Sequence, residues 1–150
     1  MTVAAILKHK GSEVASARPE DTIETVVRVL TERSIGAVVV LDPSGRPLGI
    51  LSERDIVHAL AARGAATLAM TAGELMTRAL KTATPNTTVG EAMGMMTFGR
   101  FRHLPVIDNG ALVGLVSIGD VVRAKILQQE AEVDGLRAYV SGAAYVSGAD

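Results

Sequence analysis

Two short motifs in the chain combine a serine with an aspartate three residues later. They read Ser52-Glu53-Arg54-Asp55 and Ser117-Ile118-Gly119-Asp120. Each follows an apolar run and precedes a segment with helical spacing, so each serine stands at a predicted helix N-cap. A helix N-terminus presents unpaired N–H groups that suit an anion, and a short carboxylate beside it can accept both hydroxyls of a ribose. The alternative is plain helix capping, with the aspartate favoured in the first turn by the helix dipole.

A basic cluster precedes the second motif and has no charged counterpart before the first. Its members are Arg100, Arg102 and His103, and the equivalent earlier positions are Ser34, Gly36 and Ala37. Arginine suits phosphate because its planar guanidinium donates two hydrogen bonds at once. The alternative is a solvated basic edge. We expect the cluster to supply charge to a phosphate bound at Asp55, with Arg54 adding to it, and the site at Asp120 to be less basic.

The elements that hold these residues follow from an internal repeat. Residues 19–23 align with 85–89, residues 40–42 with 106–108, and residues 49–57 with 114–122. Each copy predicts a β-α-β-β-α unit: an extended lead-in, a helix, a hairpin of two apolar runs, and a helix after the serine. A unit of about 60 residues is marginal for folding alone. We therefore expect the copies to share one core across a pseudo-two-fold axis.

Local signals mark the ends of the first helix in each copy. The spacings Asp21-x-x-Glu24 and Thr88-x-x-Glu91 predict capping boxes at the N-termini. Gly36 and Gly99 lie where a left-handed residue is expected to end the helix. Both copies should therefore begin and end this helix in the same way.

These patterns divide the chain into three parts. We expect a first repeat with its N-terminal lead-in at residues 1–66, a linker and second repeat at 67–128, and a helical or flexible tail at 129–150. The linker spans residues 64–73, and residues 71–76 could form a short helix. The tail holds one arginine against four acidic residues, and its end is rich in glycine, serine and alanine. Its first part should extend the last helix, and its end should fray or dock on another subunit.

The duplicated unit resembles a tandem pair of cystathionine β-synthase (CBS) domains. Each copy closes on Gly-h-h-Ser-x-x-Asp-h-h, where h is apolar, and His103-Leu104-Pro105-Val106 precedes the second closing motif. The resemblance covers roughly residues 8–127. It implies an α/β fold of two CBS repeats related by a pseudo-two-fold axis, with a C-terminal helical tail. It is closest to the stand-alone bacterial type, which carries no catalytic domain.

The resemblance also implies a function. Family members are regulatory sensors that bind an adenine nucleotide in the cleft between the copies. AMP is the first candidate, and ATP, ADP, NAD(H) and S-adenosylmethionine are the others. Members commonly pair into disc-shaped homodimers, and here the regulated protein is unknown. The remaining alternative is a nucleotide-independent dimerisation or interaction scaffold, for which exposed methionines would supply an adaptable apolar surface. Intact Ser and Asp in both copies favour the sensor.

Roles for individual residues follow from the same resemblance. In the family the aspartate holds the ribose, the serine lies near the phosphate, and the lead-in segments and apolar walls hold the adenine. The expected nucleotide-binding residues are Lys10, Val14, Gly36, Ala37, Ser52, Arg54, Asp55, Thr77, Leu80, Arg100, Arg102, His103, Leu104, Pro105, Ser117 and Asp120.

Composition narrows the remaining classes of function. The chain has 150 residues, a net charge of -1, 3% aromatic residues and no cysteine. The lack of cysteine excludes thiol catalysis and Cys-ligated metal sites and is compatible with the reducing cytoplasm, the expected location. Near-neutral charge and few aromatics disfavour binding to nucleic acid or an anionic membrane. No apolar run reaches the roughly 20 residues that a membrane span needs.

Catalytic and metal-binding motifs are missing from the sequence. Neither G-x-S-x-G nor a P-loop occurs, so we predict no enzyme, no catalytic residue and no catalytic cofactor. The three histidines lack the spacing of metal ligands, so no metal site is expected, and Mg²⁺ would arrive only with ATP. His58 falls within a predicted helix, where we expect a surface or packing role.

Overall fold

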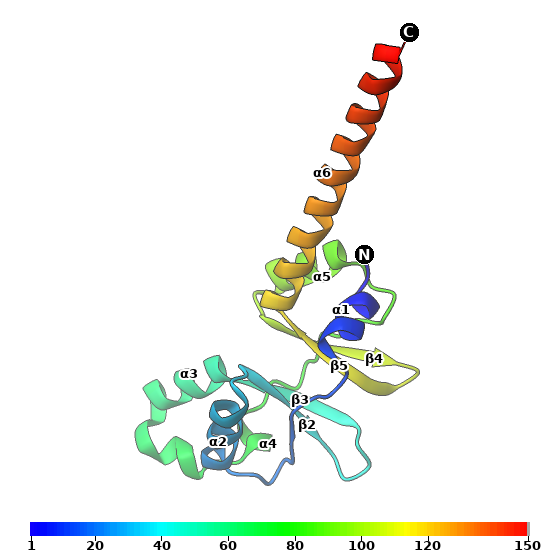
Figure 1. Cartoon of the computed structure of the whole chain (residues 1–150). Helices are drawn as coiled ribbons and strands as arrows, with labels where there is room; N and C mark the ends of the chain where they lie inside the picture. Colours follow the sequence, from blue (N-terminus) through cyan, green and yellow to red (C-terminus); the bar gives the residue numbers. More distant parts are fainter. Residues whose placement is uncertain (150) are drawn as a thin grey trace.

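Two α/β halves meet through their sheets, and a long helix projects from one of them (Figure 1). This computed structural model describes residues 1–149, with side-chain exposure for residues 1–142. The element order is α1 (Val3–Lys10), β1 (Ser16–Ala17), α2 (Ile23–Arg33), β2 (Ala37–Leu41), β3 (Pro47–Ser52), α3 (Glu53–Arg63), η1 (Gly64–Ala69), α4 (Ala72–Leu75), α5 (Val89–Gly99), β4 (His103–Asp108), β5 (Ala111–Ser117) and α6 (Ile118–Ala149). The predicted pair of β-α-β-β-α repeats is confirmed.

The sheets repeat the same pairing in both halves. In the first copy β1 runs parallel to β2, and β2 is antiparallel to β3. In the second copy β4 is antiparallel to β5, and a parallel bridge between Ala83 and Val106 takes the place of β1. That bridge is equivalent to the pairing of Ala17 with Val40 in β1 and β2. The lead-in segments before Pro19 and Pro85 are therefore extended, as the repeat predicts.

Strand register sets where each Ser-x-x-Asp motif lies. Ser52 ends β3 opposite Ala37, and Ser117 ends β5 opposite His103. The helix that follows is fixed to the start of the neighbouring strand by one backbone bond. In the first copy the Glu53 N–H donates to the Gly36 carbonyl at 2.9 Å, and an equivalent bond of 2.7 Å forms in the second. Each motif thus lies beside the first residues of a strand at the boundary between the halves.

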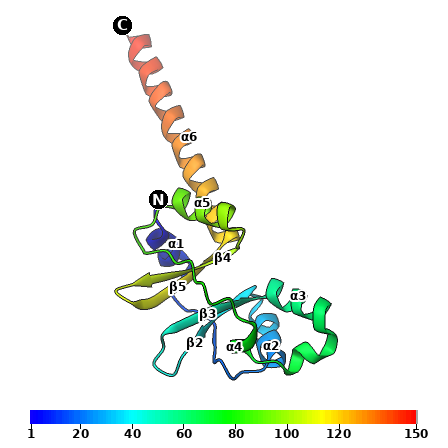
Figure 2. The same cartoon turned by 180° about the vertical axis from the view of Figure 1, so that it is seen from behind.

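The lead-in helices are exchanged between the two copies. Helix α1 begins the chain but packs on the second copy, where Val3 and Ile6 join the core of that half. The Val3 N–H donates to the Thr87 carbonyl at 2.8 Å. Helix α4, which confirms the predicted short helix in the linker, packs on the first copy through Ala72 and Met76. The view from behind shows α1 against β5 and α4 beside α2 (Figure 2).

The N-terminus of α2 differs from the predicted capping box. The N-cap is Thr22, whose hydroxyl accepts from the Thr25 N–H at 3.2 Å. The prediction that Asp21 caps this helix was wrong, because the Asp21 carboxylate turns back to accept from the Arg18 N–H at 2.9 Å. The predicted box formed by Thr88 and Glu91 at the start of α5 is confirmed.

The C-termini of α2 and α5 end on left-handed residues, but not on the glycines that we expected. Ser34 has φ 52° and Arg100 has φ 56°, so both carry side chains in a conformation that normally favours glycine. Gly99 is the last residue of α5, and Gly36 lies two residues beyond Ser34. The left-handed turn at Arg100 begins the segment that carries the basic cluster.

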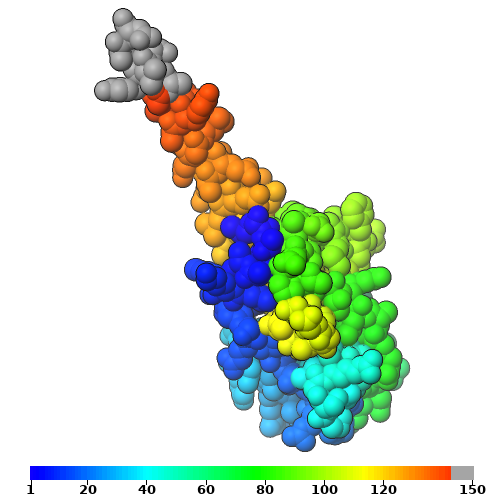
Figure 3. Space-filling view, turned by 90° about the vertical axis from the view of Figure 1, so that its right-hand side faces the viewer, coloured from blue at the N-terminus to red at the C-terminus, as the bar shows by residue number. Residues whose placement is uncertain are grey.

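The last helix continues well past the second repeat. Helix α6 runs unbroken from Ile118 to Ala149, so the predicted extension beyond residue 128 is confirmed. That the end of the tail frays or docks on another subunit stays a prediction. The described residues between 129 and 142 are all exposed, and in the space-filling view the helix stands clear of the body (Figure 3).

Gly49 and Gly114 hold equivalent positions in the two copies, and each lets an exchanged segment approach closely. We expect an added methyl group to lower the free energy of unfolding by different amounts at the two positions. A Cβ at Gly49 would lie 2.7 Å from the Thr77 carbonyl oxygen, which is backbone held by β3. A Cβ at Gly114 would meet only the flexible Leu7 side chain, at 2.5 Å. Gly49→Ala should lower the free energy of unfolding by about 1–3 kcal/mol, and Gly114→Ala by less. Urea unfolding measures both, and a larger loss for Gly114→Ala would contradict the prediction.

Candidate functional site

A cavity of about 350 Å³ lies between the two copies, and we call it the Asp55 cavity. Its walls come from the start of α3, from the linker after α4, and from the segment joining α5 to β4. The lining residues are Ile50, Ser52, Glu53, Arg54, Asp55, His58, Thr77, Ala79, Leu80, Lys81, Arg100, Phe101, Arg102, His103 and Pro105. The structure therefore brings the basic cluster of the second copy to the Ser-x-x-Asp motif of the first.

The Asp55 cavity is lined by more positive than negative charge. Its cationic side chains are Arg54, Lys81, Arg100 and Arg102, and its acidic ones are Glu53 and Asp55. All four cations are exposed residues, so they reach the cavity from its rim. The excess of cations and the start of α3 both favour an anionic group at this position.

The carboxylate of Asp55 both caps α3 and keeps an oxygen for a ligand. Its Oδ2 accepts from the Ser52 N–H at 2.9 Å and from the Ser52 hydroxyl at 3.0 Å. In return the Asp55 N–H donates to the Ser52 Oγ at 3.3 Å. Within the described part of the chain, the other oxygen Oδ1 has no hydrogen-bond partner. Capping thus orients the carboxylate and leaves Oδ1 able to accept a hydroxyl.

His103 lies at the boundary of two cavities and is held neutral. Burial lowers the pKa of the imidazole below 6.5, and the nearby charge of Lys10 lowers it further, against the opposing effects of Glu53 and Asp120. A Cβ on Gly36 would lie 3.1 Å from Nε2 of His103, so this glycine makes room for the ring. Without ligand His103 therefore adds little positive charge at neutral pH, and its contact with a phosphate stays a prediction. It can offer a ring N–H to a ligand instead.

A second cavity, of about 380 Å³, contains the other motif, and we call it the Asp120 cavity. It is lined by Lys10, Glu13, Val14, Ala15, Arg33, Ser34, Ile35, Gly36, Ala37, His103, Leu115, Ser117 and Asp120. Its two cations, Lys10 and Arg33, are matched by two acids, Glu13 and Asp120. The Asp120 cavity therefore lacks the cationic excess of its counterpart.

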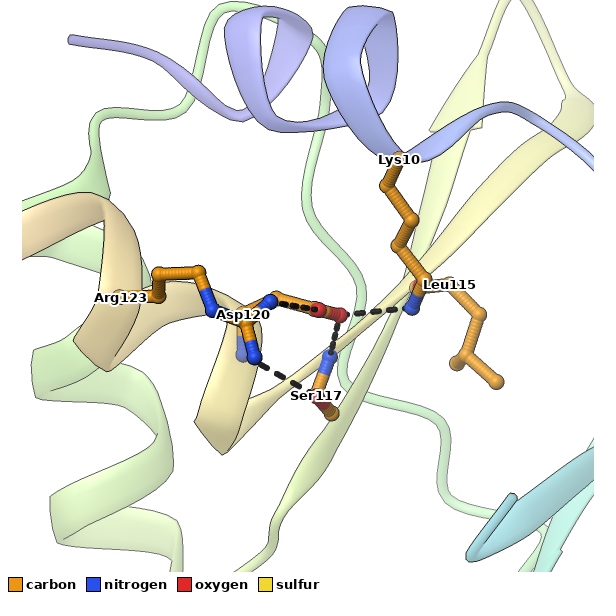
Figure 4. Close-up of polar contacts among 5 residues, drawn as sticks. All are labelled: Lys10, Leu115, Ser117, Asp120 and Arg123. Carbon is orange, nitrogen blue, oxygen red and sulfur yellow. Dashed lines mark hydrogen bonds and ion pairs between the residues drawn. The ribbon is translucent and has the colours of Figure 1, made fainter. Parts of the chain in front are cut away.

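Lys10 forms an ion pair with the carboxylate of Asp120 in the second motif. Its ammonium group donates to Asp120 Oδ2 at 2.6 Å and to the Leu115 carbonyl at 2.9 Å (Figure 4). The same Oδ2 accepts from the Ser117 N–H at 2.8 Å. Burial acts to raise the pKa of Asp120, but the bonds from Lys10 and Ser117 outweigh it and hold that pKa below 3.8. Asp120 is thus ionised and already paired.

This ion pair predicts a pH-dependent contribution to stability. Because the folded-state pKa of Asp120 lies below its ordinary value of 3.8, the pair stabilises the fold above that pH and loses effect as the pH falls through the folded-state pKa. We expect Lys10→Met to lower the free energy of unfolding by about 1 kcal/mol at pH 7. Urea unfolding between pH 7 and pH 3 should show this difference narrowing below about pH 4. A constant difference would contradict the assignment.

The other expected site residues divide between the cavities and the core. Thr77, Leu80 and Pro105 line the Asp55 cavity, and Val14 lines the Asp120 cavity. Leu104 lines neither, because it is fully buried in the core of the second copy, so its expected contact with ligand was wrong.

Several lining residues were missed from the sequence. His58 was expected to be a surface or packing residue, and the structure adds it to the wall of the Asp55 cavity. Its position three residues after Asp55, on the same face of α3, was the signal that could have found it. Lys81 and Phe101 also line this cavity but lie in irregular segments, where no periodicity shows which way a side chain points.

The described residues form neither a metal cluster nor a membrane-spanning helix. No group of three or more histidine, cysteine, aspartate or glutamate side chains among them could hold a metal ion. None of the described helices combines the length and apolarity of a transmembrane segment. The Asp55 and Asp120 cavities are the ones that contain the Ser-x-x-Asp motifs.

Comparison with known families finds two matches within the chain. The CBS domain model matches residues 6–62 and 72–126. CBS domain-containing protein CBSX3, mitochondrial, of Arabidopsis thaliana is 36% identical over 149 residues, which span 94% of this chain and 72% of that protein. The family matches thus contain both Ser-x-x-Asp motifs and end before the projecting part of α6.

Solved structures share the fold. The CBS-domain containing protein ATU1752 from Agrobacterium tumefaciens is 43% identical with a TM-score of 0.81, and the alignment covers 83% of this chain and 99% of that one. The CBS domain pair of protein MJ0100 is 26% identical with a TM-score of 0.76, covering 85% of this chain and 98% of that one. That pair was crystallised with 5′-methylthioadenosine and S-adenosyl-L-methionine, both of which contain adenosine.

Proposed function

The chain belongs to the CBS domain family, whose paired domains are regulatory, and we propose that it binds an adenine nucleotide in the Asp55 cavity. The observation that carries the proposal is the cationic excess of this cavity beside an aspartate with a free carboxylate oxygen. Its volume of about 350 Å³ lies within the range of small-molecule sites. The MJ0100 pair supports an adenosine-containing ligand in general.

The cavity offers contacts for the ribose, the phosphate and the adenine of a nucleotide. Oδ1 of Asp55 would accept the ribose hydroxyls, and the start of α3 with Arg54 would face the phosphate. Arg100 and Arg102 would donate to phosphate oxygens from the opposite copy. The partly buried Leu80 and the buried Pro105 would contact the adenine ring. A ligand held in this way touches both copies at once.

The Asp120 cavity should bind the same ligand more weakly. A ribose at Asp120 must displace the Lys10 ammonium, which is 2.6 Å from the carboxylate. The cavity also offers no excess of cations to a phosphate. We therefore propose one tighter and one weaker site in each chain.

The proposed regulatory step is a shift of population. A nucleotide that bridges both copies stabilises whichever arrangement of the halves it binds more tightly, by the difference in its affinities. A partner protein that contacts one arrangement would then bind better or worse when ligand is present. We also propose that two copies of the chain pair into a homodimer.

Isothermal titration of the purified chain tests the nucleotide proposal. The ligands are AMP, ADP, ATP, NAD⁺, NADH and S-adenosylmethionine, with adenosine as the control that lacks phosphate. We expect saturable binding with one tighter site per chain, and adenosine at least about tenfold weaker than AMP because it makes no charged bond to the arginines.

Two outcomes would change the proposal. Absence of binding to all the ligands would favour the alternative, a scaffold that works through protein contacts alone. Two equal and independent sites would retain the sensor but overturn the asymmetry argued from Lys10 and the basic cluster.

A further inference from the structure

The projecting part of α6 exposes a row of apolar side chains to solvent. Val133, Leu136 and Val140 are 46%, 64% and 56% exposed, and Val122 and Ile126 extend the row toward the body. Val121 and Ala124, on another face of the helix, are buried in the core of the second copy. The row is therefore not covered by the chain's own body.

The projecting part of α6 gains little stability from the rest of the chain. The described residues from 129 to 142 make no buried contact, and Gly135 and the β-branched Val133 and Val140 lower intrinsic helix propensity. Most helical stability in proteins comes from packing an apolar face, and this face has no packing partner within the described chain. A partner surface that covers the apolar row would therefore stabilise the projecting part of α6.

The spacing of the row matches a two-stranded coiled coil. The positions 122, 126, 129, 133, 136 and 140 alternate in steps of four and three, which is a heptad seam. The first seam position carries the β-branched Ile126, Val133 and Val140, and the second carries Val122, Gln129 and Leu136. β-Branched residues at the first seam position with leucine at the second favour two parallel strands, and the turn that carries Val133 and Leu136 fits this rule. Gln129 is the single polar residue in the seam and lies at the second seam position.

Charges beside the seam favour a second copy of this chain in parallel orientation. In that arrangement Lys125 faces Glu130 of the other copy, and Glu132 faces Arg137, so both kinds of pair attract. In an antiparallel pair that uses the whole seam, Glu130 and Glu132 would each face their own equivalents. Like charges at these positions are repulsive, so the parallel pair is favoured.

We propose that the α6 helices of two chains form a parallel coiled coil along residues 122–140. The family match ends at residue 126, so Val122 and Ile126 lie within the second CBS repeat and the rest of the seam lies beyond it. The coiled coil deepens the homodimer proposed above by naming the surface that joins the copies. It is separate from nucleotide binding, because no seam residue lines the Asp55 cavity.

Disulfide trapping in this cysteine-free chain tests the pairing and its orientation. Leu136→Cys places one thiol on the seam, and Ala138→Cys places one on the opposite side of the same helix. With glutathione disulfide as the oxidant, we expect the full-length Leu136→Cys chain to become a covalent dimer on a non-reducing gel. The Ala138→Cys chain should stay monomeric on the gel. Equal yields for the two variants, or no dimer from either, would overturn the proposal.

A charge exchange supplies a second, milder test that leaves the seam intact. Glu132→Lys sets a lysine against Arg137 of the other copy, and we expect sedimentation equilibrium to show dimerisation weakened by about tenfold. Adding Arg137→Glu restores opposite charges and should restore the affinity. Failure of the double variant to recover would overturn the parallel arrangement. Nucleotide titration of the same variants should be unchanged, which separates this proposal from that of the Asp55 cavity.

Discussion

Asp55→Ala is expected to weaken nucleotide binding by about a hundredfold. The substitution removes the carboxylate acceptor for two ribose hydroxyls, and a hydrogen bond to a charged group contributes about 1.5–3 kcal/mol. A total loss of about 3 kcal/mol corresponds to that change in Kd. Isothermal titration of the variant with AMP, beside the wild-type chain, measures the effect. An unchanged Kd would mean that Asp55 serves only to cap α3.

Asp120→Ala is the matched control for this substitution. It removes an equivalent capping carboxylate, which accepts from the Ser117 N–H at 2.8 Å, and also breaks the pair with Lys10. Its loss of stability should therefore equal or exceed that of Asp55→Ala. Binding at the tighter site should change by less than about threefold. Comparable loss of affinity in both variants would show that the effect comes from damaged helices rather than from the ribose contact.

Leu104→Ala is expected to lower the free energy of unfolding by about 2–5 kcal/mol. Leu104 has no exposed surface and lies in the core of the second copy with Val89, Val106 and Val116. Truncation leaves a cavity there that the surrounding strands and helices cannot fully close. Urea unfolding measures the loss, and a change below about 1 kcal/mol would contradict the packing role.

Leu80→Ala provides the contrasting control. Leu80 is partly exposed and lines the Asp55 cavity, so its truncation should cost little stability. We expect this variant to weaken nucleotide binding by about tenfold, because an apolar contact with adenine is lost. The folded fraction of Leu104→Ala should bind with nearly the wild-type Kd. If Leu80→Ala lowers stability and Leu104→Ala weakens nucleotide binding instead, then Leu80 belongs to the core and Leu104 to the cavity wall.

Much of the candidate site could be predicted because its residues carry local signals. The Ser-x-x-Asp motifs combine a capping serine with an acidic residue in the first turn, and both signals act within four residues of sequence. Their duplication placed Arg100 and Arg102 against Asp55 as soon as two copies were related by an axis. The structure places these side chains around one cavity.

The sequence was least informative for residues whose surroundings come from distant parts of the chain. Leu104 belongs to an apolar strand in which the sequence alone does not separate core from cavity wall. His103 is neutral because burial and the charge of Lys10 act on its ring. Lys10 is 110 residues away from Asp120, so no local pattern could assign it to that carboxylate.

By itself, the sequence determined the duplicated unit, the order of its strands and helices, and the two motifs that end its hairpins. These features depend on periodicity and capping, which act over a few residues. The tertiary structure alone decided that α1 packs on the second copy, that Lys10 pairs with Asp120, and that the seam of α6 stays uncovered. Each of these depends on which surfaces meet after folding, and contacts between distant segments leave no periodic trace in either segment.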